Sequence, residues 1–192
     1  MSFPKPQATL RSASGVPTGR LAIWWVLASE IVIFGGLLAA YVMHRLGHPE
    51  WAHESEHTNT LAGGINTLVL LTSSLMAVLA HQAAQKGNGP RAANFLWLTI
   101  LGAVMFVGIK SVEWTLEISH GFVLTKSPFW SFYYCAAGLH ALHVIAGATI
   151  MGIVAIDARK GKELQRVELI GIYWHFVDVV WIFLFPLLYI AK

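Results

Sequence analysis

The chain has 192 residues, of which 56% are hydrophobic and only 12% are charged. This composition, with a mean hydropathy of +0.59, excludes an ordinary soluble domain. The formal net charge of +3 comes from residues that fall mainly in short loops, so it indicates contact with anionic lipid rather than with nucleic acid. We therefore expect an integral membrane protein.

Five apolar runs follow one another, each close to the ~20 residues that cross ~30 Å of hydrocarbon. They cover residues 21–43, 61–81, 94–114, 132–156 and 170–191. None alternates apolar and polar residues as a barrel strand does, so the sequence predicts an all-α, polytopic bundle of five transmembrane helices. Residues 1–20 are polar and contain proline and glycine. They are expected to form a disordered cytoplasmic leader ahead of a single transmembrane domain, 21–192.

The distribution of lysine and arginine predicts the orientation, because cytoplasmic loops carry an excess of these residues. If the N-terminus is inside, nine lie on the cytoplasmic side: Lys5, Arg11, Arg20, Lys86, Arg91, Arg159, Lys160, Lys162 and Arg166. Three lie on the opposite side: Arg45, Lys126 and Lys192. We therefore expect a cytoplasmic N-terminus and an external C-terminus.

Polar side chains inside the predicted spans are informative, because an ionisable group in hydrocarbon requires a partner or a purpose. Glu30, in ASEIVIFGG, has no cation within one helical turn and is the strongest functional candidate. Lys110 and Glu113, in IKSVEW, are three residues apart, a spacing that favours an ion pair. Asn66, in INTLVLLTSS, is typical of residues that hydrogen-bond between helices.

Histidines occupy the last two spans. His140 and His143 are three residues apart in GLHALHVIAG, and His175 and Asp178 have the same spacing in YWHFVDVVW, so each pair shares a helix face. A buried hydrogen-bond network, a proton relay and bis-histidine haem ligation are all compatible with this pattern. The network is favoured over haem because His140 and His143 are too close to serve two haems at two depths.

The predicted outer loop, HRLGHPEWAHESEHTNT, contains enough side chains to bind zinc or copper: His44, His48, Glu50, His53, Glu54, Glu56 and His57. Their irregular spacing favours a solvated loop over a metal site. The single cysteine, Cys135, lies inside the fourth run and excludes a cysteine cluster. The sequence therefore predicts no catalytic, cofactor-binding or metal-binding residue in this chain.

Several of these stretches together resemble subunit III of the haem-copper terminal oxidases, in its short five-helix bacterial form. The resemblance is carried, in family order, by ASEIVIFGG, INTLVLLTSSLMAVLAH, KSVEW, FYYCAAGLHALHVIAGATIMG and YWHFVDVVWIFLFPLLYI. Two N-terminal helices of the seven-helix mitochondrial form are absent. Lys110 also stands where the family commonly has glutamine.

The resemblance implies a non-catalytic subunit of a complex in the bacterial cytoplasmic membrane that reduces O₂ to water and pumps protons. Haem and copper would lie in partner subunits. The implied partners are oxidase subunit I as the main contact, subunit II, a small subunit IV, bound phospholipid and a respiratory supercomplex.

The resemblance also assigns roles to residues. Glu30 matches the family's intramembrane glutamate near bound lipid, and His81 is a candidate for the proton-entry surface. The implied buried polar network comprises Asn66, Lys110, Glu113, His140, His143, His175 and Asp178.

Other interpretations stay open. A related subunit accompanies nitric oxide reductases and another accompanies quinol oxidases, although the glutamate of ASEIVIFGG favours the cytochrome c branch. A protein of another class, a stand-alone proton-coupled transporter, would use Glu30 and the histidines as a relay. That interpretation requires discontinuous helices, which the fourth and fifth runs do not indicate.

Overall fold

The computed structural model describes residues 18–191, and every regular element in that range is helical. Five helices are long and apolar enough to cross a membrane: α1 (Thr18–Gly47), α3 (Thr60–Gln85), α4 (Gly89–Ser119), α5 (Pro128–Arg159) and α6 (Gln165–Phe185), which continues into the π-helix η2 (Pro186–Ile190). A short helix, α2 (Trp51–Ser55), follows α1. The predicted all-α, five-span fold is confirmed. Most of the expected leader, residues 1–17, lies outside the described residues.

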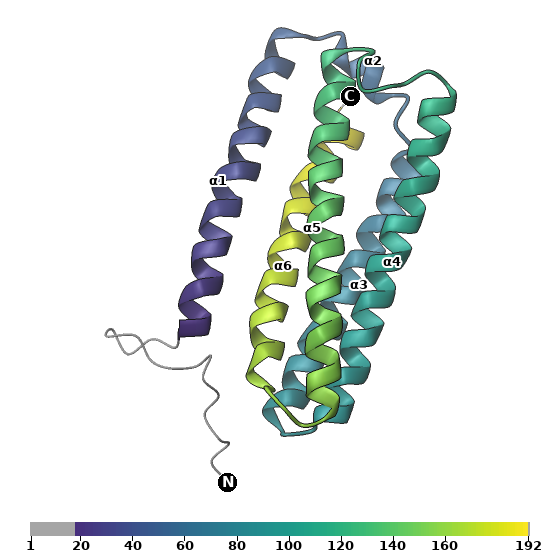
Figure 1. Cartoon of the computed structure of the whole chain (residues 1–192). Coiled ribbons are helices and arrows are strands. Elements are labelled where there is room, and N and C mark those ends of the chain that lie inside the picture. The colour runs from purple at the N-terminus through teal and green to yellow at the C-terminus, as the bar shows by residue number, and fades with distance from the viewer. Residues whose placement is uncertain (1–17, 192) are drawn as a thin grey trace.

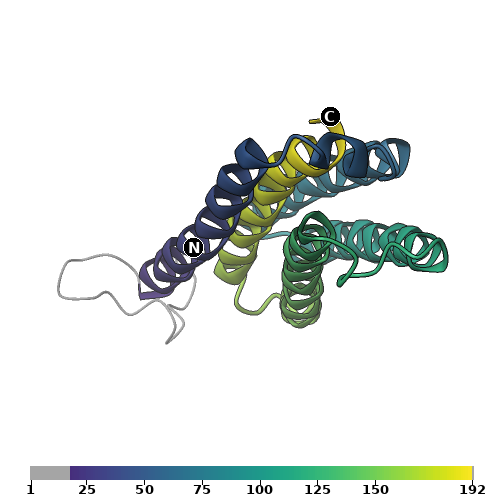
Figure 2. The same ribbon diagram turned by 90° about the horizontal axis from the view of Figure 1, so that it is seen from above.

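The helices α3, α4, α5 and α6 form a ring in which each packs against two neighbours. Helix α1 lies outside this ring and contacts α6 and α5 (Figure 1). Seen from above, α1, α6 and α3 form one row, and α5 and α4 form a second (Figure 2). Helix α1 begins at the end of the bundle opposite to η2, as an odd number of spans requires. Which end faces the cytoplasm stays a prediction.

Asparagine side chains cap the first residues of α3 and α4. The side-chain oxygen of Asn59 accepts a hydrogen bond from the backbone N–H of Ala62 at 3.0 Å, at the start of α3. Asn88 does the same for the N–H of Arg91 at 3.1 Å, at the start of α4. Each cap satisfies a backbone donor that the helix itself leaves free.

Small residues allow the ring helices to approach closely, which is the usual packing of helices in membranes. The buried faces of α3 and α4 are rich in alanine: Ala77, Ala80, Ala83, Ala84, Ala92, Ala93 and Ala103. A Cβ atom on Gly102 would lie 2.7 Å from the Cβ of Ser73, so this glycine is required for the observed separation of α3 and α4. On the other side of the ring, a Cβ on Gly147 would lie 2.8 Å from the ring of Tyr173.

The π-helix η2 begins at Pro186, which has no backbone N–H and cannot continue the α-helical pattern. Its characteristic bond runs from the N–H of Ala191 to the carbonyl of Pro186 at 2.8 Å. Side chains from earlier elements bind three further carbonyls in and after η2: the Tyr41 hydroxyl donates to Leu187 O at 2.9 Å, Thr60 donates to Tyr189 O at 3.3 Å, and Arg45 and Ser55 donate to Ala191 O. The end of the chain is therefore tied to α1, α2 and α3.

Candidate functional site

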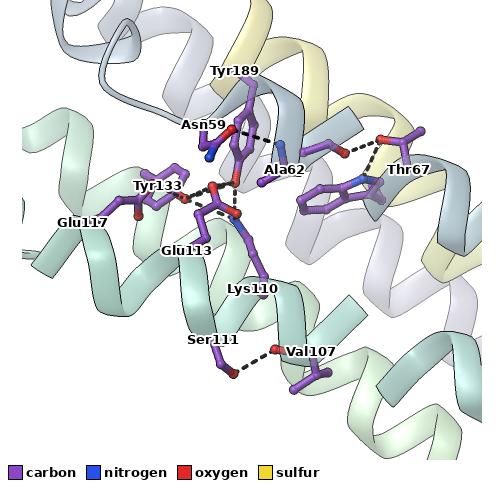
Figure 3. Close-up of polar contacts among 12 residues, drawn as sticks. Asn59, Ala62, Thr67, Val107, Lys110, Ser111, Glu113, Glu117, Tyr133 and Tyr189 are labelled. Carbon is purple, nitrogen blue, oxygen red and sulfur yellow. Dashed lines mark hydrogen bonds and ion pairs between the residues drawn. The ribbon is translucent and has the colours of Figure 1, made fainter. Parts of the chain in front are cut away.

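A cluster of charged and phenolic side chains lies between α4, α5 and η2, near the end of the bundle that holds η2 (Figure 3). We call it the lysine cluster, and its members are Lys110, Glu113, Glu117, Tyr133 and Tyr189. None of the five is more than 5% exposed, so their polar groups depend on one another for hydrogen bonds.

The Lys110 ammonium group uses all three of its protons within the lysine cluster. Nζ donates to Glu113 Oε2 at 3.1 Å, to the Tyr133 hydroxyl at 3.0 Å and to the Tyr189 hydroxyl. Nζ also lies 4.9 Å from the ring centroid of Tyr133 and 4.8 Å from that of Tyr189, within the range of a cation–π contact. The predicted pair of Lys110 and Glu113 is confirmed.

The lysine cluster contains one more carboxyl group than it has cations. The Tyr189 hydroxyl lies 2.7 Å from Glu113 Oε1, and the Tyr133 hydroxyl lies 2.9 Å from both Glu113 Oε1 and Glu117 Oε1. A phenol has a single proton to donate, so Tyr133 serves only one carboxyl at a time. Glu117 Oε2 is buried and has no hydrogen-bond partner in residues 18–191. Glu113 and Glu117 therefore share a single cation within the lysine cluster.

Sequence reasoning did not select Glu117, Tyr133 or Tyr189. Glu117 lies four residues after Glu113, so helical spacing was a signal that could have placed it on the same face. No spacing rule reaches the two tyrosines, because they come from α5 and η2 and meet α4 only through the packing of the bundle.

Glu30 lies against α5 rather than alone in the membrane. Its Oε2 atom is 3.0 Å from Nε2 of His143, and the two side chains are 16% and 15% exposed. Glu30 Oε2 has no hydrogen-bond partner among residues 18–191, but its distance to His143 Nε2 is within the range of an ion pair. The sequence shows no cation within one helical turn of Glu30, and the structure places its partner on another helix, α5.

The protonation pattern of this pair follows from the other nitrogen of His143. Nδ1 lies 2.7 Å from the carbonyl oxygen of Leu139, which can only accept, so Nδ1 carries a hydrogen. Nε2 is then the free position that faces Glu30. A protonated carboxyl beside a neutral imidazole and a carboxylate beside an imidazolium differ only by transfer of one proton between these two atoms.

On the polar face of α6, His175 has a hydrogen-bond partner and Asp178 does not. His175 Nδ1 lies 2.6 Å from the hydroxyl oxygen of Ser74 on α3. Asp178 is 4% exposed, and neither of its carboxyl oxygens has a hydrogen-bond partner in the described chain. His81, the predicted proton-entry residue, lies at the other end of α3 from the lysine cluster and contacts Gln85 at 2.9 Å.

His140 and Asn66 are fully buried, and their side-chain polar atoms have no partners among residues 18–191. The His140 ring stacks on Trp181 with centroids 5.2 Å apart and meets the Phe106 ring at 5.4 Å. A haem ligated by His140 would have to displace these rings, so the packing does not fit the bis-histidine interpretation.

The seven residues of the predicted network do not form one network. Lys110 and Glu113 belong to the lysine cluster and His143 contacts Glu30. His175 contacts Ser74, while the side-chain polar atoms of the remaining three have no hydrogen-bond partner in the described chain: Asn66, His140 and Asp178. The reason is geometric, because these side chains lie at different depths and on different faces of four helices.

In the outer loop, the candidate zinc or copper ligands do not converge on one point. His48 Nδ1 lies 2.7 Å from Glu50 Oε1, whereas His53 faces Glu56 at 3.8 Å. A hydrogen bond from its own backbone N–H, and then the contact with His48, lower the pKa of Glu50. In the part of the chain that the structure describes, no three histidine, cysteine or acidic side chains are grouped to hold a metal ion.

Fold and site together define a polytopic helical membrane protein whose intramembrane charges face other helices of the same bundle. Comparison with known proteins identifies the family. The family model for cytochrome c oxidase subunit III matches residues 13–192, and the chain belongs to this family.

Relatives named as subunits of different oxidases match the chain at similar sequence identity. It is 32% identical over 200 residues to cytochrome c oxidase subunit 3 of Corynebacterium diphtheriae, covering 100% of this chain and 96% of that one. It is 32% identical over 174 residues to cytochrome bo(3) ubiquinol oxidase subunit 3 of Pseudomonas aeruginosa, covering 87% and 82%. It is 31% identical over 183 residues to heme-copper oxidase subunit I+III of Aeropyrum pernix, covering 90% of this chain and 22% of that one.

Replacing Lys110 with methionine is expected to lower the free energy of unfolding by about 3–5 kcal/mol, because two buried carboxyl groups lose their only cation. Adding Glu113→Gln and Glu117→Gln should recover part of the loss. The exposed Lys162→Met is the matched control and should stay within ~0.5 kcal/mol of the unchanged protein. Thermal unfolding in detergent compares the stability of Lys110→Met, of the triple variant and of the Lys162→Met control. Equal melting temperatures for Lys110→Met and the control would contradict the role given to the lysine cluster.

Glu30→Gln should preserve the contact between α1 and α5, because an amide of the same shape fills the same space beside Nε2 of His143. Glu30→Leu should lose it, at a cost of about 0.6–1.7 kcal/mol. Spin labels on the exposed residues Ala28 and Ile150 report the separation of the two helices. We expect an unchanged distance distribution for Gln and a broader one for Leu. An unchanged distribution in Glu30→Leu would mean that the contact does not hold α1.

Proposed function

We propose that this chain is a non-catalytic subunit of a bacterial haem-copper oxidase, embedded in the cytoplasmic membrane. Its role is to stabilise the catalytic subunit and to hold phospholipid beside it. The observation that supports the proposal is that intramembrane charged side chains contact one another within this chain. Lys110 and Glu113 bind each other, and Glu30 faces His143. Such groups serve the bundle itself and leave the reduction of O₂ to other chains.

The reaction named by the family requires haem and copper, and under this proposal partner subunits carry both. Subunit I is the main partner, with subunit II, a small subunit IV and a respiratory supercomplex as further ones. The Aeropyrum pernix relative supports the first contact, because 22% of a protein named subunit I+III aligns with this chain. Two units joined in one polypeptide are neighbours in its membrane.

The role we propose does not depend on the electron donor. Support comes from the equal identity, 32%, to subunits named for a cytochrome c oxidase and for a ubiquinol oxidase. We place bound phospholipid near Glu30, where α1 lies against the outside of the helix ring and the Glu30 side chain is partly exposed. His81 and Gln85, at the predicted cytoplasmic end of α3, are offered as part of the proton-entry surface.

The transporter interpretation has less support. Helices α1, α3, α4 and α5 run without interruption over 26–32 residues each, and the described π-helix begins only at Pro186. Transporter sites of the discontinuous-helix type need a break near the middle of the membrane.

Purification in mild detergent through a tag on this chain tests the proposal. We expect a coloured complex whose visible spectrum shows haem, and in which mass spectrometry finds a large catalytic subunit. The same complex purified through that subunit should contain this chain in equal amount. A colourless preparation of this chain alone, from cells with an active oxidase, would contradict the proposal.

A further inference from the structure

An apolar groove runs along the outer face of the α3–α4 pair. Its central part is a cavity of about 470 Å³ between the two helices. Leu68, Thr72 and Met76 of α3 line one side, and Leu98, Leu101 and Met105 of α4 line the other. Because these residues lie within two membrane spans, the cavity opens toward lipid.

The same groove continues to the end of the bundle at the α3–α4 turn. A second cavity, of about 180 Å³, is lined there by Leu79, Gln82, Lys86, Asn88, Arg91 and Phe95. Along α3 the lining residues of both cavities follow one another at intervals of three or four, and along α4 they do the same. This is the spacing of a single helix face, so the two cavities are parts of one groove.

The turn end of the groove carries positive charge that nothing in the described chain balances. Lys86 and Arg91 are exposed and have no carboxylate within 4.0 Å among residues 18–191. The Arg91 guanidinium lies 5.8 Å from the ring centroid of Phe95, which holds it beside the apolar floor. At this end of the bundle Arg20 pairs with Glu168 at 2.6 Å and Arg166 with Asp157 at 3.4 Å, whereas Arg159 has no carboxylate within 4.0 Å among residues 18–191.

The dimensions match one leaflet of a bilayer. Ten residues separate Met76 from Lys86, which is about 15 Å along a helix and about half the hydrocarbon thickness. An anion at the α3–α4 turn with an apolar chain of that length would therefore occupy the basic end and reach the near edge of the apolar cavity, at Met76 and Leu98. A free phosphate would leave the apolar part empty, and an uncharged lipid would leave the cations unpaired.

We propose that the α3–α4 groove binds one anionic phospholipid. Its phosphate lies between Lys86 and Arg91, with Asn88 and Gln82 as further polar contacts. One acyl chain runs past Leu79 and Phe95 toward Met76 and Leu98. The inference rests on the membrane placement in the proposed function, but this site is separate from the lipid proposed near Glu30, because α1 does not line it.

The test compares the purified complex with two charge variants that each lose two exposed cations at the same end of the bundle. Lys86→Gln/Arg91→Gln removes the basic end of the groove, whereas Arg159→Gln/Lys160→Gln is the matched control at the α5–α6 turn. Phosphatidylglycerol and phosphatidylcholine are added separately in detergent, and the melting temperature and the amount of retained lipid are measured.

We expect phosphatidylglycerol, but not phosphatidylcholine, to raise the melting temperature of the unchanged complex and of the control. Lys86→Gln/Arg91→Gln should bind phosphatidylglycerol about 30-fold more weakly. Each lost cation contributes about 1 kcal/mol of binding free energy, and 1.4 kcal/mol corresponds to a tenfold change in affinity. Leu98→Trp, which fills the groove without changing its charge, should also abolish the shift. Since Leu98 is 48% exposed, this variant does not disturb the core.

An equal response of all three charge forms to phosphatidylglycerol would overturn the proposal. So would loss of the catalytic subunit from Lys86→Gln/Arg91→Gln with unchanged lipid content, because the groove would then receive a protein helix. If this chain purifies without any oxidase and still responds to phosphatidylglycerol through Lys86 and Arg91, the lipid site stands and the proposed function fails.

Discussion

The structure depends on one constraint: a full charge inside hydrocarbon is stabilised by a partner of opposite charge within the protein. The lysine cluster meets this constraint for a full charge, since Lys110 donates to Glu113, Tyr133 and Tyr189 at once. These partners come from three different elements. The lysine cluster therefore fixes α4, α5 and η2 relative to one another. A displacement of any of these elements would change the contacts of the Lys110 ammonium group.

The π-helix links this cluster to the rest of the bundle. Pro186 ends the α-helical pattern, and the turn that follows places the Tyr189 hydroxyl beside Lys110 while its backbone carbonyl accepts from Thr60. Tyr41 of α1 binds the adjacent carbonyl of Leu187. Helix α1, which lies outside the ring, is thus attached by backbone acceptors at one end and by the Glu30–His143 contact nearer its middle.

Features that depend on neighbouring residues could be predicted from the sequence, and features that depend on helix packing could not. Length and hydropathy predict the five spans, and a three-residue spacing predicts the pair of Lys110 and Glu113. The partner of Glu30 lies more than a hundred positions away and becomes apparent only when α1 packs on α5. Asp178 shares a face with His175, but its carboxyl group has no partner in the described chain.

The central claim is that these polar groups hold a supporting subunit together and do not take part in O₂ chemistry. Removing this chain from the purified oxidase, and following O₂ consumption over many turnovers, tests it most directly. The account predicts an initial rate close to that of the intact complex, followed by faster loss of activity that is reversed when the chain is added back. An initial rate near zero would make the chain part of the catalytic machinery, and an unchanged lifetime would remove its stabilising role; either result would contradict the account.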